Sequence, residues 1–168
     1  MEMGFRAKIR AMHHGKLALF LLLTIFLPTH QVVMPQRDIN AEETVARNFQ
    51  RLRETANLPP IEREEGTAFS RAACEAAAHG LREKISAEGA NYSALILTSA
   101  NADEPEAIRA LALRAWKPDD RLVTGVCFAN TPAFASGRYW IAVGVLANAS
   151  EKSVSELLGG GSNIPNGE

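Results

Sequence analysis

The sequence contains few of the side chains that usually mark a catalytic or metal site. Three of its four histidines precede residue 31, so the rest of the chain retains only His79. A single histidine cannot supply the several imidazoles of a typical zinc site. No Gly-x-Ser-x-Gly motif is present to form the nucleophile elbow of a serine hydrolase. We therefore expect no metal, no cofactor and no catalytic residue.

An excess of positive charge is also missing. The formal net charge is −1. The first 34 residues hold four basic side chains and one acidic side chain, which leaves 14 basic and 18 acidic residues and a net charge of −4 in the remainder. Nucleic-acid binding requires a clustered positive surface that meets the phosphates. This balance argues against a nucleic-acid partner.

The sequence has no apolar run long enough to span a membrane. The run Leu17–Leu27 covers 11 positions and would extend only about 16 Å as a helix, against roughly 30 Å for a bilayer core. Basic residues precede it and Pro28 follows it, which is the pattern of a secretory signal peptide. We predict that residues 1–34 are a leader with its linker, and that the protein is secreted or periplasmic. Because no small-x-small cleavage site follows Pro28, an uncleaved membrane anchor at residues 17–27 is the alternative.

Cysteine is scarce, with two residues in the whole chain. Both Cys74 and Cys127 lie in the part that follows the leader. An even number of cysteines in an exported protein favours a disulfide bond. We predict a Cys74–Cys127 bond. The alternative is two separate buried thiols that pack as small apolar residues.

The remaining sequence alternates between helical and strand patterns. Apolar residues recur every three or four positions in three segments, which predicts helices, and apolar or β-branched runs predict strands between and after them. The predicted helices cover residues 40–56, 67–87 and 106–116. The predicted strands cover residues 92–98, 121–129 and 138–146.

The helix predictions rest partly on capping residues. Asn40 and Glu43 form a capping-box pattern at the start of the first helix, and Gly89 is a candidate cap after the second. Asp103 is the candidate cap of the third. The tail from residue 148 to residue 168 is polar and rich in glycine, so we expect it to be disordered.

The order helix, helix, strand, helix, strand, strand predicts an α+β fold. The last two strands would form a hairpin joined by the loop Asn130–Gly137. We expect a three-layer α-β-α sandwich around a small, mainly antiparallel sheet. The domain would cover residues 38–147.

Several segments together resemble the CAP superfamily of SCP-like extracellular domains. Residues 48–53 followed by Asn57-Leu58-Pro59-Pro60 are similar to the opening helix of the family and its turn. The alanine-rich segment Phe69–Leu81 is similar to the second helix. The segment Glu106–Trp116 resembles the closing helix, Thr124-Gly125-Val126 the central strand, and Gly137-Arg138-Tyr139-Trp140 the following strand.

This resemblance covers residues 40–147 and implies an α-β-α sandwich with a shallow cleft. In the family the cleft often holds two histidines and two acidic residues. The present chain lacks the histidine segment after the second helix and the short histidine motif before the central strand. The resemblance therefore implies a shortened, degenerate member, and no metal or cleft residue is carried over to this sequence.

Three side chains are the candidates for ligand binding: His79, Tyr139 and Trp140. Successive side chains on a strand point to opposite faces, so only one of Tyr139 and Trp140 can be fully buried if one face is wet. We expect the more exposed one to mark a binding surface, although both residue types also occur in sheet cores. His79 is either a surface residue or a general base paired with Glu75 or Glu83.

A CAP-like scaffold that lacks the ionisable side chains of the family's cleft predicts a non-catalytic binding or interaction module. It would bind an unidentified ligand at the cell envelope or outside the cell. Two alternatives stay open. One is an envelope hydrolase that uses His79 with a nearby acidic residue, and the other is a structural module tethered by an uncleaved leader. Contact with a membrane is expected only through that leader.

Overall fold

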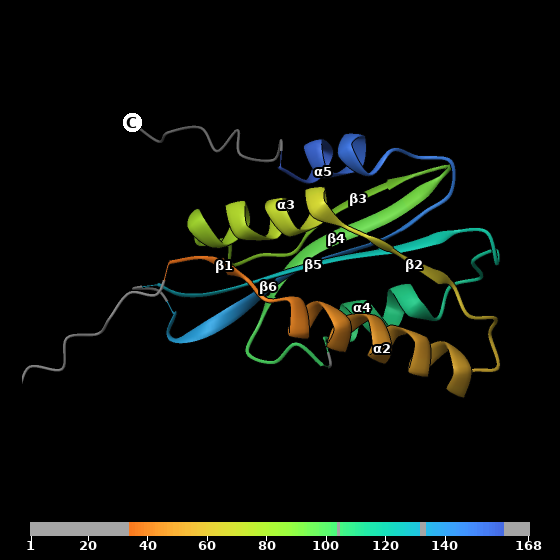
Figure 1. The fold of residues 1–168 in the computed structure, drawn as a ribbon, viewed down its shortest axis with the longest axis horizontal. Helices are drawn as coiled ribbons and strands as arrows, with labels where there is room; N and C mark the ends of the chain where they lie inside the picture. The colour runs from red at the N-terminus through yellow and green to blue at the C-terminus, as the bar shows by residue number, and fades with distance from the viewer. Residues whose placement is uncertain (1–33, 104, 132–133, 160–168) are drawn as a thin grey trace, which may run out of the picture. The chain divides into compact units, whose positions relative to one another are not determined.

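A computed structural model describes residues 34–103, 105–131 and 134–159 (Figure 1). Five strands follow one another across the sheet in the order β1-β5-β6-β4-β3. These neighbours pair antiparallel, and a sixth strand, β2, pairs parallel with β5. In chain order the strands are β1 Gln36–Arg37, β2 Glu62–Glu65, β3 Ile85–Gly89, β4 Tyr92–Ser99, β5 Arg121–Thr131 and β6 Phe134–Leu146. The predicted leader lies outside the described residues, apart from Met34.

Helices cover both faces of this sheet. Helices α2 (Ile39–Thr55) and α4 (Glu106–Ala112) contribute to one hydrophobic core, and α3 (Thr67–Ala78) and α5 (Glu151–Gly159) contribute to another. Figure 1 shows the two pairs on opposite sides of the strands. The predicted α+β class is confirmed, because four helices pack on a six-stranded, mostly antiparallel sheet.

The two cores follow from the alternation of side chains along β6. Ile141, Val143 and Val145 point toward α2 and α4, whereas Trp140 and Ala142 point toward α3 and α5. All five are fully buried. A strand whose two faces are both covered needs apolar residues at successive positions rather than at every second one. The continuous apolar run of β6 therefore matches its place in the middle of the sheet.

Gly125 allows α3 to lie directly against β5. A Cβ atom at this position would overlap the backbone of Phe69 and Ser70 in the first turns of the helix. The facing side chains of α3 are also small, since Ala73 and Ala77 are fully buried against the sheet. The close approach thus depends on the absence of a side chain at residue 125.

The substitution Gly125→Ala is expected to lower the free energy of unfolding by roughly 1–3 kcal/mol, because overpacking against backbone cannot be relieved by rotating a side chain. Urea denaturation would measure this loss. Gly159→Ala is the matched control, because its new Cβ would lie at an ordinary 3.7 Å from Glu75 Oε2. Equal stability of the two variants would show that α3 is not held against β5 in the described way.

The prediction of one long helix from Thr67 to Ala87 is wrong. Helix α3 ends at Ala78, and Gly80 follows with a φ of 65°. This left-handed conformation is accessible to glycine and stops a helix. Ile85 and Gly89, which were expected in the helix and at its cap, belong to strand β3, which pairs with β4.

The ends of other helices and strands also differ from their predicted positions. Helix α2 begins at Ile39, and the Asp38 carboxylate rather than Asn40 accepts the Ala41 N–H at 2.9 Å. Helix α4 follows Pro105 instead of an Asp103 cap and ends at Ala112 rather than at residue 116. The expected loop between β5 and β6 is shorter than predicted, since Thr131 pairs directly with Phe134.

The tail was predicted to be disordered from residue 148, which is wrong for residues 151–159. They form α5, whose Val154 and Leu158 are buried in the core shared with α3. The Glu151 carboxylate also accepts the backbone N–H groups of Ala68 and Phe69 at 2.8 and 3.1 Å, where α3 begins. Most residues of this segment are polar, so the single apolar pair one helical turn apart, Val154 and Leu158, did not predict a helix. Residues 160–168 of the predicted tail lie outside the described part.

Candidate functional site

The two neighbouring aromatic residues of β6 point to opposite faces of the sheet. Trp140 is fully buried, and its indole N–H donates to the Leu81 carbonyl at 3.1 Å. Tyr139 is partly exposed beside the other core. Its ring packs against Phe128 of β5 with centroids 5.0 Å apart. Trp140 is therefore a core residue, and Tyr139 is the one of the pair that a ligand can reach.

Tyr139 borders a surface groove of about 370 Å³, which we call the Tyr139 groove. The other walls come from the start of α2 and from the segment that follows β4. These walls carry mainly carboxylate, amide and hydroxyl groups. The lining residues besides Tyr139 are Asp38, Asn40, Ala41, Thr44, Asn101, Ala102 and Asp103.

Local hydrogen bonds hold the walls of the Tyr139 groove in place. Asp38 caps α2, and the Thr44 hydroxyl donates to the Asn40 carbonyl at 2.8 Å. The Asn48 side-chain amide donates to the Asp103 carbonyl and so ties α2 to the opposite wall. The groove thus combines one aromatic ring with several polar groups that can donate or accept hydrogen bonds.

His79 is not paired with an acidic residue in the described part of the chain. It follows the last residue of α3 and is exposed. Within the described part of the chain its side chain makes no hydrogen bond and no ion pair, with Glu75, Glu83 or any other residue. The structure therefore pairs His79 with neither Glu75 nor Glu83, and His79 does not line the groove beside Tyr139.

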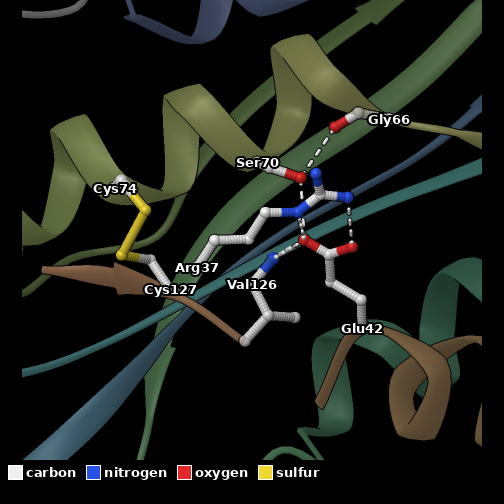
Figure 2. Close-up of a disulfide and its surroundings, with 7 residues drawn as sticks. All are labelled: Arg37, Glu42, Gly66, Ser70, Cys74, Val126 and Cys127. Carbon is white, nitrogen blue, oxygen red and sulfur yellow. Dashed lines mark hydrogen bonds and ion pairs between the residues drawn. A yellow bond between two sulfur atoms is a disulfide. The ribbon is translucent and has the colours of Figure 1, made fainter. Parts of the chain in front are cut away.

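The predicted disulfide bond is confirmed. Cys74 and Cys127 are bonded, with their Cα atoms 5.0 Å apart, across a sequence separation of 53 residues. The bond joins the middle of α3 to β5 (Figure 2). It lies next to a buried polar cluster that was not predicted from the sequence.

The centre of this cluster is Glu42, whose side chain is fully buried. Figure 2 shows its carboxylate facing the Arg37 guanidinium, with the Ser70 hydroxyl and the Val126 nitrogen close to the same carboxylate. Arg37 Nε and Nη2 each donate at 2.9 Å, one to each carboxylate oxygen. The Ser70 hydroxyl lies 2.7 Å and the Val126 backbone N–H 3.2 Å from Glu42 Oε1.

Glu42 fills a gap along the outer edge of β5. Strand β2 pairs with residues 121–124 of β5, and β1 pairs with residues 127–128. Val126 lies between the two paired stretches. Its carbonyl accepts the Asp38 N–H at 2.9 Å, and its N–H donates to Glu42. The carboxylate therefore takes the place of a missing strand at this position.

Glu42 remains ionised although it is buried. Burial alone would raise the pKa of this carboxyl, but the hydrogen bonds from Arg37, Ser70 and Val126 together outweigh it, and the pKa is lowered. The hydrogen bonding between Arg37 and Glu42 also raises the pKa of Arg37. Because Ser70 is also buried, we assign this cluster a structural role rather than nucleophilic catalysis.

One signal in the sequence could have revealed Glu42. The apolar stripe of α2 contains Val45 and Phe49, and Glu42 lies three residues before Val45, on the same helical face. A charged residue on such a face predicts a buried charge that needs a partner. The partners Ser70 and Val126 are 28 and 84 residues away, so helical spacing could not name them.

Two residues of segment 48–53, which resembles the opening helix of the CAP family, connect α2 to its surroundings. Arg53 is fully buried and donates from Nε to the Pro59 carbonyl at 2.8 Å and from Nη1 to the Ala112 carbonyl at 2.7 Å. Asn48 makes the bond to Asp103 described above. Both side chains connect α2 to the segments that surround it.

Comparisons of the chain with known protein families, with curated proteins and with solved structures find no match in any of the three. The resemblance to the CAP superfamily therefore stays a prediction from the sequence. The described residues include no group of three or more His, Cys, Asp and Glu side chains placed to hold a metal ion. None of the helices in the described ranges is long and apolar enough to cross a membrane.

Proposed function

We propose that this chain is an exported, non-catalytic binding domain of CAP-like architecture that acts at the cell envelope or outside the cell. The observation that carries the proposal is the position of Tyr139. Its ring is partly exposed, packs against the Phe128 ring and borders a groove with polar walls. A partly exposed aromatic ring beside polar groups offers both an apolar contact and hydrogen bonds to a ligand.

The arrangement of layers supports the CAP-like part of this proposal. Helices α2 and α4 lie on one face and α3 and α5 on the other, as a three-layer α-β-α sandwich requires. The contacts of Asn48 and Arg53 give a structural reason for both residues in the opening helix. The missing histidine cleft agrees with a binding domain that has no catalytic centre.

The disulfide supports the proposal that the domain acts outside the cytoplasm. Bonds of this kind persist in secreted and periplasmic proteins and are rare in a reducing cytosol. The pattern of the first 34 residues, a basic stretch followed by an apolar run and a proline, points to the same compartment.

The walls of the Tyr139 groove favour a neutral ligand rich in hydroxyl groups, such as a saccharide. The Asp38 and Asp103 carboxylates disfavour an anion, whereas amide and carboxylate oxygens accept hydrogen bonds from hydroxyl groups. The apolar face of a sugar ring can stack on the Tyr139 ring. A saccharide is also a common component of cell surfaces, where an exported domain would meet it.

A titration of the full chain with the tetrasaccharide of N-acetylglucosamine tests this proposal. We expect saturable changes in the amide NMR signals of Tyr139 and Asn101, and a loss of affinity of about tenfold or more in Tyr139→Ala, because truncating a central aromatic contact removes most of its binding energy. Tyr92→Ala is the control, since Tyr92 packs beside the core on the other face.

Two outcomes would overturn the proposal. If Tyr92→Ala weakens binding as much as Tyr139→Ala, or if millimolar tetrasaccharide leaves the groove signals unchanged, the groove is not a saccharide site. If the sugar is cleaved during the titration and His79→Ala stops the cleavage, the chain is a hydrolase. The exposed and unpaired state of His79 leads us to expect no cleavage.

A further inference from the structure

Two arginines lie against one aromatic ring at the start of β6. The guanidinium carbon of Arg138 is 5.1 Å from the centroid of the Phe134 ring, and that of Arg82 is 5.7 Å from it. Arg138 belongs to β6, whereas Arg82 lies in the segment between α3 and β3. These residues lie on the α3 face of the sheet, because Phe134 packs against Trp140. We call them the Arg82–Arg138 pair.

The surroundings hold this arrangement in place. The Phe134 ring meets Trp140 edge to face at 5.8 Å, and the Trp140 indole N–H binds the carbonyl of Leu81, the residue before Arg82. The fully buried indole thus fixes both the ring and the chain that carries Arg82. A cation over an aromatic face is attracted to the ring. The N–H bonds of a guanidinium lie in its own plane, so contact with a ring through the flat face leaves them free. The donors are therefore available to a ligand.

No acidic side chain in the described ranges neutralises the charges of the Arg82–Arg138 pair. Within the described residues neither side chain forms an ion pair, whereas Arg37, Arg114 and Arg121 each bind a glutamate. Glu83 and Lys84 follow Arg82 in the chain, and their two charges cancel each other. Two like charges near one ring repel each other, and a bound anion would remove that repulsion.

We propose that the Arg82–Arg138 pair and Phe134 form a binding site for a phosphate group. The planar donor fork of arginine matches the oxygens of a phosphate or carboxylate. A phosphate monoester carries a charge of about −1.5 to −2 near neutral pH, which balances two guanidinium groups, whereas a carboxylate balances one. Arg82 is exposed, so its side chain can turn toward an anion at the rim of the ring. This site lies on the opposite face from the Tyr139 groove and does not depend on it.

Inorganic phosphate, titrated into the full ¹⁵N-labelled chain at constant ionic strength, tests the proposal. We expect saturable shifts of the side-chain Nε–H signals of Arg82 and Arg138. Arg82→Gln and Arg138→Gln should each weaken binding by about tenfold, because each removes one charge-assisted contact. Arg109→Gln is the matched control, because Arg109 is an exposed arginine of α4 on the other face and its loss should change the affinity less than twofold.

Acetate and glycerol 3-phosphate complete the design. Acetate at equal concentration should bind about tenfold more weakly, because it carries one charge and two oxygens. Tighter binding of glycerol 3-phosphate than of inorganic phosphate would identify an organic phosphate as the ligand, and equal binding would identify the free ion. Either result supports the site.

The proposal is overturned if phosphate causes no more change than chloride, or if Arg109→Gln weakens binding as much as Arg82→Gln. It is also overturned if acetate and phosphate bind equally. Should Arg138→Gln fail to fold because residue 138 is half-buried, the exposed Arg82 still gives a decisive variant.

Discussion

Replacement of both Cys74 and Cys127 by alanine is expected to lower the free energy of unfolding by roughly 4 kcal/mol, the loop-closure entropy of a bond that spans about 53 residues. The bond joins α3 to β5, where Gly125 already brings the helix against the strand. Its loss therefore loosens the contact between the helix and the middle of the sheet. Few small domains keep a wide margin after such a loss.

Urea denaturation of the oxidised protein, the reduced protein and the double variant would measure this effect. The reduced protein and the variant should unfold at similar urea concentrations, both well below the oxidised protein. A reductant should leave the double variant unchanged, which controls for effects on other residues. A difference below about 1 kcal/mol between oxidised and reduced protein would contradict the expectation.

Truncation of Glu42 is expected to have the next largest effect. Glu42→Ala should cost roughly 2–4 kcal/mol, because each buried donor that loses its acceptor costs about 1–3 kcal/mol. The Val126 N–H would lose its acceptor and Ser70 would lose one of its two. Arg37 contributes less to this cost, because its side chain is 41% exposed and can be solvated. Chemical denaturation would measure the loss, and Glu43→Gln, at the exposed neighbouring position, should change stability by less than about 0.5 kcal/mol.

The contribution of Glu42 should also depend on pH. Its pKa is lower in the folded protein than in the unfolded chain, so between these two values the unfolded state binds more protons and stability rises with pH. The stabilisation is complete above the unfolded pKa of about 4.3 and is lost as the pH falls through the folded pKa. Glu42→Gln has no such titration. The stability difference between wild type and Glu42→Gln should therefore shrink on acidification, and a constant difference from pH 7 to pH 3 would contradict the assignment.

Local patterns in the sequence predicted the elements that local forces determine. The apolar runs of β4, β5 and β6 and the stripe of α2 follow from side-chain periodicity, and all four elements are present. The end of α3 was missed because Ile85 continues the four-residue spacing of Phe69 and Ala73, and only the backbone of Gly80 shows the break. The apolar pair Val154 and Leu158 in α5 was too short a signal beside the glycine-rich tail.

The polar sites depended on contacts that no spacing specifies. The alternation of Tyr139 and Trp140 was predictable, but which of them faces the groove was not, because helices cover both faces of the sheet. Glu42 meets Val126, which is 84 residues away, and Arg82 meets Phe134 and Arg138 from a separate segment. Such pairs are determined by the packing of layers, which becomes known only with the three-dimensional structure.

The divided outer edge of β5 bears on how the protein avoids aggregation. A long strand with a free edge presents a row of N–H and C=O groups to which another chain can add. Here β2 covers one stretch, β1 covers another, and the Glu42 carboxylate occupies the position between them. A second molecule would have to displace two short strands and a buried ion pair to reach that row, and the edge that remains belongs to charged, exposed strands of two and four residues, which disfavours strand addition between molecules.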